Sequence, residues 1–268
     1  MVEDATRRRP IVLAHRGGGG LAPENTLAAF DNGLSLGSDG IELDVHLARD
    51  GVAVVIHDRT LDRTTDGSGA VADVDASGLD VFDAGYRFTR NGGYPWRGRG
   101  CRIPRLRDVL ARLACPVLIE LKTPDPRLAA AVADDVRVAG ADSRVLIGSF
   151  HAPALEAVRA CAPHLRRGAD REAIRANSRP WHGPLPTADF HSFQVPEVFG
   201  DERIVTPEFV QRAHARGVDV IVWTVDREDE IRRLLDWGVD GLITDRPDVA
   251  VPVVHGWWQS FRQELMTT

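Results

Sequence analysis

The feature that most constrains the fold of this chain is an alternation between short apolar runs, many of them rich in Val and Ile, and longer stretches of helical period. Strands that alternate with helices in this way are typical of βαβ units and a parallel sheet. The nine apolar runs cover residues 11–15, 40–46, 52–57, 116–121, 144–150, 164–169, 192–195, 218–225 and 241–245. The stretches of helical period cover residues 25–37, 104–114, 126–139, 152–162, 206–216 and 226–237.

The second and third apolar runs are too close together to be parallel neighbours. Only residues 47–51 separate them, whereas a parallel crossover needs about a dozen residues. We therefore expect an antiparallel hairpin that turns at Asp50–Gly51 and places Glu42 roughly opposite His57. Eight parallel strands remain, and in a chain of 268 residues they favour a closed (β/α)8 TIM barrel, an α/β fold, over an open doubly wound sheet.

One long segment interrupts the alternation. Residues 59–100 are rich in Gly, Asp, Thr and Arg, carry isolated aromatic residues and show no strong period. A loop of this length inside a compact domain is usually functional or a small insertion. We expect a single domain over residues 1–268, with an insertion at about residues 80–103 that lies over the C-terminal mouth of the barrel.

The overall composition limits the partners of the chain. Apolar residues make up 43% and charged residues 27%, as in ordinary soluble globular proteins, and the net charge of −6 argues against nucleic acid as the main partner. No apolar run is long enough to cross a bilayer, and residues 1–10 lack the apolar segment of a secretory signal. We expect a cytoplasmic location and no stable membrane insertion; a monomer and a homo-oligomer both fit the sequence.

Acidic residues occur in a run that should form a central strand. In residues 40–46, Glu42, Asp44 and His46 share one face, because side chains alternate along a strand. Central barrel strands are normally apolar, and an ionised carboxylate buried without a partner is very costly. This pattern favours a functional carboxylate pair over its alternatives, a salt bridge to Arg or Lys and an exposed strand edge.

A second apolar run carries the same anomaly. Glu120 and Lys122 share one face at the C-terminal end of residues 117–124, the end where barrels build their active sites. An ordinary Glu–Lys ion pair is the alternative. Together with Glu42 and Asp44, Glu120 would supply an all-oxygen ligand set that suits Mg²⁺ or Ca²⁺ with water and substrate oxygens, and does not suit structural zinc.

Two histidines each end an apolar run, His15 the first and His57 the third. A lone histidine in such a place is more often a core residue. A pair at the same rim as three acids can instead divide the general-acid and general-base roles that phosphodiester cleavage needs. Arg16 offers a bidentate fork for a phosphate, and Lys122 offers a point charge.

Other features at strand ends have weaker signals. Gly17–Gly20 match no phosphate-binding motif, so we expect these glycines to form a turn and not a phosphate cradle. Asn25 is the expected N-cap of the following helix. Phe150 and Trp223 end apolar runs, where an aromatic residue either packs in the core or lines a pocket. Residues 255–261 are expected to pack a C-terminal helix against the barrel.

With these residues in place, the sequence resembles the glycerophosphodiester phosphodiesterase family over nearly its whole length. Members of that family are (β/α)8 barrels that hydrolyse glycerophosphodiesters to glycerol 3-phosphate and an alcohol, using a divalent cation. The matching stretches are "HRG", "PENTLAAF", "IELDVHLARDGVAVVIHDRTLDRTTDGSG", "IPRLRDVL", "LIELKTP", "VWTVD" and "GVDGLITDRPD".

The resemblance implies a role for each site residue. It makes His15 and His57 the general acid/base pair and places Arg16 and Lys122 on the phosphate. The implied ligands of Mg²⁺ or Ca²⁺ are Glu42, Asp44 and Glu120. The attacking group is a vicinal glycerol hydroxyl, through a cyclic phosphate, or a water. Phe150 and Trp223 remain candidates for substrate contact.

Two other functions are compatible with this framework. A phospholipase D-like enzyme acting on lysophospholipids or sphingomyelin would need a wide apolar mouth, which the aromatic residues of 82–96 could supply. A non-catalytic phosphate-binding barrel is disfavoured, because it would be expected to lack at least one of the five candidate histidines and acids. We expect a small-molecule glycerophosphodiester as the substrate.

Overall fold

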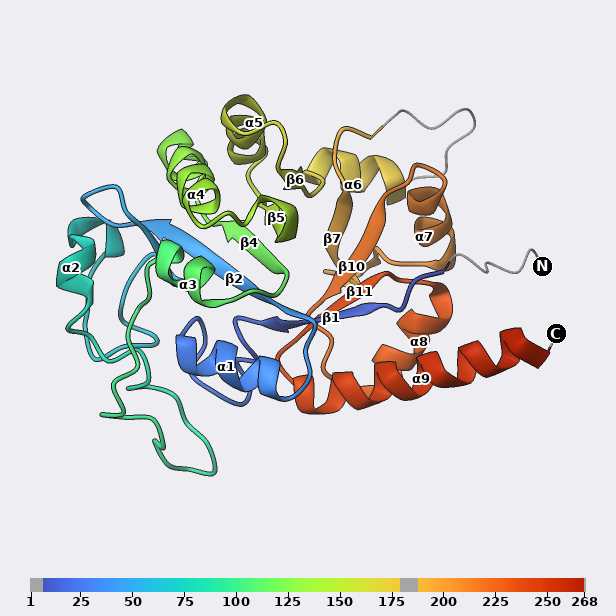
Figure 1. Cartoon of the computed structure of the whole chain (residues 1–268), viewed down its shortest axis with the longest axis horizontal. Coiled ribbons are helices and arrows are strands. Elements are labelled where there is room, and N and C mark those ends of the chain that lie inside the picture. Colours follow the sequence, from blue (N-terminus) through green and yellow to red (C-terminus); the bar gives the residue numbers. More distant parts are fainter. Residues whose placement is uncertain (1–6, 179–187, 268) are drawn as a thin grey trace.

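The computed structural model describes residues 7–178 and 188–267, and a nine-stranded sheet forms its centre (Figure 1). Residues 1–6, part of the N-terminal segment considered above for a secretory signal, lie outside these ranges. Eight of the strands run parallel in the order β6-β5-β4-β2-β1-β11-β10-β7. They are β1 (Ile11–His15), β2 (Gly40–Leu47), β4 (Val117–Leu121), β5 (Val145–Gly148), β6 (Arg166–Arg167), β7 (Ser192–Pro196), β10 (Asp219–Trp223) and β11 (Gly241–Thr244).

The sheet closes on itself between β6 and β7. The backbone N–H of Ala169 donates to the carbonyl of Ser192 at 2.8 Å, and that of His191 donates to the carbonyl of Arg167 at 2.8 Å. A parallel bridge joins Gly168 to Ser192. The predicted (β/α)8 barrel is therefore confirmed, and the open doubly wound sheet is excluded.

Helices surround the barrel and bury their apolar faces against the strands (Figure 1). In α8, Ile231, Leu234 and Leu235 are buried, and their spacing gives one apolar face; Gly238, in the left-handed region at φ +94°, ends the helix. The larger helices are α1 (Leu27–Ser35), α3 (Leu106–Arg112), α4 (Pro126–Val138), α5 (Ala152–Cys161), α6 (Arg171–Ser178), α7 (Pro207–His214), α8 (Glu228–Trp237) and α9 (Pro247–Thr267).

The C-terminal helix α9 runs along the barrel, as expected for residues 255–261 (Figure 1). Trp257 packs against the core on this side, and the Arg7 guanidinium lies 4.7 Å from the centre of its ring. None of the helices in the described ranges is both long enough and apolar enough to span a bilayer. Smaller elements are the helices α2 (Ala76–Leu79), η1 (Val71–Asp73) and η2 (Asp142–Arg144), and the hairpin β8 (Val198–Phe199)–β9 (Glu202–Arg203).

The predicted hairpin is present, and its register differs by one residue from the expected one. Strand β3 (Ala53–Val55) pairs antiparallel with β2 after a turn at Gly51. The carbonyl of Asp44 accepts from the N–H of Ile56 at 3.0 Å. The residue opposite His57 is therefore Leu43, next to Glu42, because the three-residue turn moves the pairing by one position.

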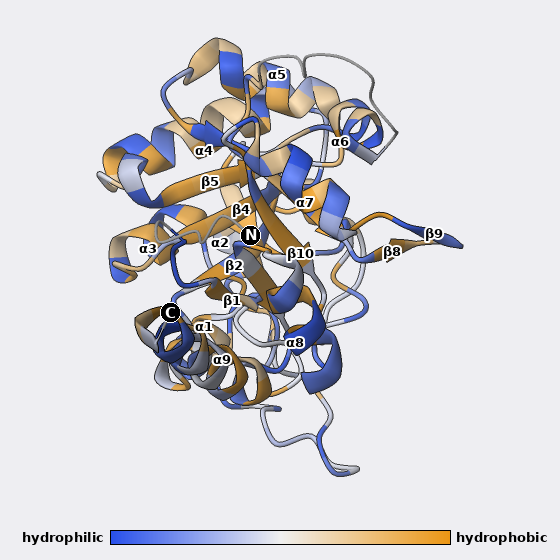
Figure 2. Cartoon of the chain, turned by 90° about the vertical axis from the view of Figure 1, so that its right-hand side faces the viewer, coloured by the Kyte–Doolittle hydropathy of each residue, from blue (hydrophilic) through white to orange (hydrophobic). Residues whose placement is uncertain are grey.

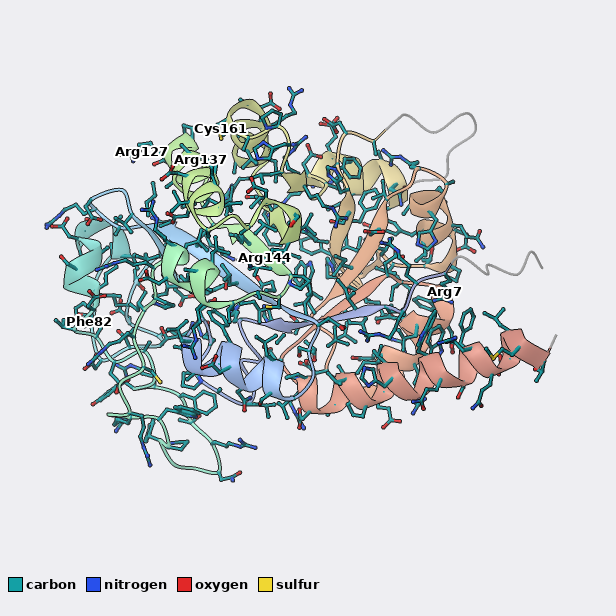
Figure 3. All side chains as sticks on the ribbon, in the orientation of Figure 1. Arg7, Phe82, Arg127, Arg137, Arg144 and Cys161 are labelled. Carbon is teal, nitrogen blue, oxygen red and sulfur yellow. The ribbon has the colours of Figure 1, made fainter. Side chains whose placement is uncertain are left out.

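The long segment after β3 builds a small core of its own beside the hairpin. Leu61 and Leu79 pack there against Val54 of β3. Figure 1 shows this segment as loops beside β2 and α2, and Figure 3 places Phe82 among them, away from the barrel axis. Ala84, Arg87, Phe88 and Thr89 of this segment line a pocket together with Gly19 and Gly20, which follow β1.

The two faces of each barrel strand have different surroundings. In β2, Leu43 and Val45 point outward into the core beneath the helices. Figure 2 shows the strands as apolar and the outer sides of helices such as α8 as hydrophilic. The lower barrel interior is filled by a layer of aliphatic residues, and above it, at the carboxyl ends of the strands, the inward positions become polar. The aliphatic layer consists of Leu13, Leu118, Leu146, Ile221 and Ile243.

Candidate active site

A cavity of about 150 Å³ opens at the carboxyl ends of the barrel strands. Eight of the nine predicted site residues line it, and the ninth, Asp44, is buried beside them with 1% of its surface exposed. The eight lining residues are His15, Arg16, Glu42, His57, Glu120, Lys122, Phe150 and Trp223.

Three carboxylates cluster at one side of this cavity, and two of them, Glu42 and Glu120, line it. Glu42, Asp44 and Glu120 each offer an oxygen atom within 4.8 Å of the others. Burial and the charge of Asp44 raise the pKa of Glu42 to about 8. Burial also raises the pKa of Glu120. Acids crowded in this way repel one another, and a hard, all-oxygen donor set of this kind fits a divalent cation such as Mg²⁺ or Ca²⁺.

Cationic side chains surround Asp44. The Lys122 Nζ lies 3.2 Å from Asp44 Oδ1 and 3.0 Å from Glu120 Oε1. The Arg16 Nε lies 3.1 Å from Asp44 Oδ2. Burial alone would raise the pKa of Asp44, but Lys122 and Arg16 outweigh it and hold that pKa below its ordinary value. Both cations are therefore paired with carboxylates of the site.

Asn25 has a different role from the predicted one. The N-cap of α1 is Thr26, whose hydroxyl accepts from the N–H of Ala29. Asn25 instead adopts φ +58°, and its Nδ2 donates to Asp44 Oδ2 at 2.8 Å. The prediction was wrong because adjacent Asn and Thr are both good N-caps, and only the path of the loop decides between them.

His15 is held by an acid from the last strand of the barrel. Its Nδ1 donates to Asp245 Oδ1 at 2.9 Å, and its Nε2 lies 3.9 Å from Glu42 Oε2. Burial lowers the pKa of His15, but the hydrogen bond to Asp245 and the charge of Glu42 outweigh burial and raise it. Sequence reasoning did not assign Asp245 to the site, although it ends the apolar run 241–245 as His15 ends the first.

His57 is held by a chain of charged groups. Its Nδ1 donates to Asp58 Oδ1 at 2.6 Å, and Arg63 Nε donates to Asp58 Oδ2 at 2.7 Å. Arg63 also donates to both oxygens of Glu24, which binds Arg16 in turn. Burial lowers the pKa of His57 despite the opposing effects of Asp44 and Asp58. Sequence reasoning missed this chain, because Arg63 and Glu24 are 39 residues apart.

The glycine run forms a turn, as predicted. The N–H of Gly17 donates to the Ala14 carbonyl at 3.0 Å, and the N–H of Gly18 donates to the His15 carbonyl at 2.8 Å. The N–H of Gly20 donates to the carbonyl of Asp245 at 3.3 Å. These amides already have acceptors, so they do not form a phosphate cradle.

The opposite wall of the cavity is aromatic. The rings of Phe150 and Trp223 meet edge to face with centroids 5.6 Å apart. Gln194, which sequence reasoning also missed, reaches the cavity from β7. A Cβ atom at Gly148 would overlap Gln194 Oε1, and one at Gly168 would lie 2.8 Å from Nε2, so these two glycines leave the space that the amide fills.

The pattern of strand-end residues matches a known family over most of the chain. Residues 15–249 match the model of the glycerophosphoryl diester phosphodiesterase family. The chain belongs to this family. It is accordingly a phosphodiesterase of the hydrolase class, built on the TIM barrel that the family's solved members share.

Individual members of the family agree with this assignment. A glycerophosphodiester phosphodiesterase of Caldanaerobacter subterraneus is 37% identical over 255 residues, which cover 92% of this chain and 98% of that protein. The crystal structure of a glycerophosphodiester phosphodiesterase from Agrobacterium tumefaciens has a TM-score of 0.73 and 31% identity, covering 90% of this chain and 98% of that one. An Oleispira antarctica phosphodiesterase, solved with the product sn-glycerol-3-phosphate, has a TM-score of 0.73 and 26% identity, covering 92% of this chain and 97% of that one.

Proposed function

We propose that this enzyme hydrolyses glycerophosphodiesters to sn-glycerol 3-phosphate and an alcohol by two-histidine acid/base catalysis. The observation that carries the proposal is that two histidines, each held at Nδ1 by a carboxylate, line one small cavity beside a cluster of three acids. The names of the relatives, and the product bound to the Oleispira antarctica phosphodiesterase, support the same substrate class.

The clustered acids are the proposed cation site. Glu42, Asp44 and Glu120 would hold Mg²⁺ or Ca²⁺, because crowded carboxylates with raised pKa values at Glu42 and Glu120 form a hard, oxygen-only donor set. A divalent cation held there would supply charge neutralisation for the phosphoryl oxygens and would lower the pKa of an attacking hydroxyl. The protein's own contribution is to fix the three acids on two adjacent strands, β2 and β4.

The histidines move the protons. A carboxylate can only accept, so Asp245 and Asp58 keep the hydrogen of each imidazole on Nδ1 and leave Nε2 to exchange a proton with the substrate. One Nε2 takes the proton of the attacking hydroxyl as the new O–P bond forms. The other gives a proton to the leaving alcohol oxygen as its P–O bond breaks.

The attacking group in this proposal is the vicinal hydroxyl of the glycerol. Its attack gives a five-membered cyclic phosphate and releases the alcohol, and water then opens the ring with the histidine roles reversed. Trapping a 1,2-cyclic glycerophosphate would support this order of events. Complete incorporation of one solvent ¹⁸O without any cyclic species would instead support direct attack by water.

The remaining residues bind and position the substrate. Lys122 and Arg16 lie where they can bind the phosphate, and Phe150 and Trp223 offer an apolar wall to its carbon atoms. The cavity of about 150 Å³ suits a small polar diester better than a lipid chain. Phe82 packs against the separate core beside β3, and none of the aromatic residues of 82–96 lines the cavity, which disfavours a phospholipase D-like activity.

A substrate panel tests the proposal. Purified enzyme is assayed for release of glycerol 3-phosphate from several glycerophosphodiesters in EDTA, Mg²⁺ or Ca²⁺, with lysophosphatidylcholine for comparison. We expect turnover that needs a cation and falls by about 10²-fold or more in His15→Ala and in His57→Ala. Full activity of either variant, or of the wild type in excess chelator, would overturn the mechanism.

A further inference from the structure

Arg171 is a cation of the active-site cavity that no predicted role explains. It is the first residue of α6 and lines the cavity on the aromatic side. Its guanidinium lies 5.4 Å from the centre of the Phe150 ring. Across residues 7–178 and 188–267, Arg171 forms no ion pair with a carboxylate.

The other two cations of the cavity are already neutralised. Lys122 lies between Asp44 and Glu120, at 3.2 and 3.0 Å from their oxygens. Arg16 binds Asp44 at 3.1 Å and Glu24 at 3.0 Å. Within the described chain, Arg171 is therefore the cavity cation that lacks a protein counter-charge.

The surroundings of Arg171 do not supply that charge. The wall beside it is apolar and includes Ala169 and Ile174. The preceding residue is acidic, but Asp170 Oδ1 accepts from the N–H of Ala173 at 2.8 Å and so caps the helix. A guanidinium placed over an aromatic ring at the edge of a cavity keeps its N–H groups in plane for an incoming anion.

We propose that Arg171 and Phe150 form a head-group subsite that binds a carboxylate on the alcohol part of the substrate. The proposal rests on the function proposed above: with the phosphate at the acid and histidine wall, the head group reaches the opposite, aromatic wall. A carboxylate there accepts a charge-assisted, bidentate hydrogen bond from the guanidinium. A phosphate in the head group would carry nearly twice the charge of a carboxylate and would need more than one free cation.

The same geometry disfavours a quaternary ammonium head group. Such a group binds best against an open aromatic face. The Phe150 face is already covered by Arg171, whose positive charge also repels an ammonium ion. The subsite therefore selects head groups by their charge.

Two substrates that differ by one carboxylate provide the test. Glycerophosphoserine and glycerophosphoethanolamine are assayed in parallel, and the ratio of their kcat/KM values is measured. In Arg171→Gln we expect kcat/KM for glycerophosphoserine to fall by about tenfold, while that for glycerophosphoethanolamine changes less than about twofold. In Arg171→Glu we expect kcat/KM for glycerophosphoserine to fall below that for glycerophosphoethanolamine. Arg175→Gln, one turn further along α6 and outside the cavity lining, is the matched control and should keep the wild-type ratio.

Each outcome is decisive. A ratio that is unchanged in Arg171→Gln and Arg171→Glu, or equal losses on both substrates, overturns the subsite and leaves the proposed function standing. Hydrolysis of neither substrate, nor of any other glycerophosphodiester, by the wild type overturns the proposed function and the subsite with it. Thermal unfolding of each variant checks that the exposed substitution leaves the fold intact.

Discussion

His15 and Asp245 are 230 residues apart in the sequence, yet Asp245 Oδ1 accepts a hydrogen bond from His15 Nδ1 at 2.9 Å. An asparagine in place of Asp245 could donate as well as accept, so the imidazole would lose its fixed tautomer. We expect Asp245→Asn to lower kcat by roughly 10²-fold or more, with KM changing less than about threefold. Steady-state kinetics on a glycerophosphodiester checks this, and an unchanged kcat would remove Asp245 from the mechanism.

Arg63 links Glu24, which binds Arg16, to Asp58, which binds His57. Its removal should let the Asp58 carboxylate move away from His57, because the guanidinium binds both Asp58 oxygens. We expect Arg63→Gln to lower kcat about tenfold, because Arg63 affects catalysis only by holding Asp58 and, through it, His57. Arg99→Gln, at an exposed position of the same segment, is the control. Equal kcat values in Arg63→Gln and Arg99→Gln would contradict this role of Arg63.

We expect Glu120 to contribute more to cation binding than to folding. In chelator we expect Glu120→Gln to unfold within a few degrees of the wild type, because the change also removes a charge from a crowded acid cluster. Added Mg²⁺ or Ca²⁺ at about 100 times its Kd should raise the wild-type Tm by roughly 5 °C or more and leave the variant unchanged. Differential scanning fluorimetry and calorimetric titration measure both effects. An equal rise in the two proteins would place the cation elsewhere, and exposed Glu208→Gln serves as the control.

Gly148 leaves room for the amide of Gln194. A methyl group there would overlap Gln194 Oε1 and displace it from the cavity. Gln194 lines the cavity, so we expect its amide to hydrogen-bond a substrate hydroxyl. Loss of one such bond in Gly148→Ala should raise KM by up to about tenfold. If the effect runs through the amide, Gly148→Ala should add little in a Gln194→Ala background, which a double-mutant cycle measures. Full additivity would show that the glycine acts independently.

His214 gives the fold a pH-dependent contribution. The hydrogen bond from its Nε2 to Asp240 Oδ2, at 2.9 Å, raises the pKa of His214 above its ordinary value. Stability from this bond is fully present below the unfolded-state pKa of about 6.5 and is lost as the pH rises through the raised folded-state pKa. His214→Ala should therefore lower Tm more at about pH 5.5 than at about pH 8.5, by a few degrees at most because the pair is partly exposed. A pH-independent difference would show that packing alone is lost.

The barrel and the lining of its cavity could be predicted because the relevant signals are local. The apolar runs predict the strands, and the polar residues at the ends of those runs predict which side chains face the mouth of the barrel. His15, Glu42 and Glu120 each interrupt an apolar run, so their sequence context alone marks them.

The partners of these residues could not be predicted in the same way. Arg63 lies in a segment without a distinctive pattern. Asp245 ends an apolar run as His15 does, but only the folded barrel shows that these two residues are partners. Asn25 was misassigned because its residue type suits a helix cap as well as a buried hydrogen bond. Gln194 and Arg171 become candidates only in the folded structure, which shows the Gln194 amide beside two glycines and both residues in the cavity lining.

The pairing of β1 with β11 has a consequence during synthesis on the ribosome. His15 is translated early, but Asp245 and the strand that carries it follow 230 residues later. At about 5 to 20 residues per second, this delay is roughly 10 to 50 s. Until β11 is made, the edge of β1 that β11 covers in the finished barrel has no partner within the chain and stays open to pairing with other chains. Catalytic competence arises only when the last strand closes the ring.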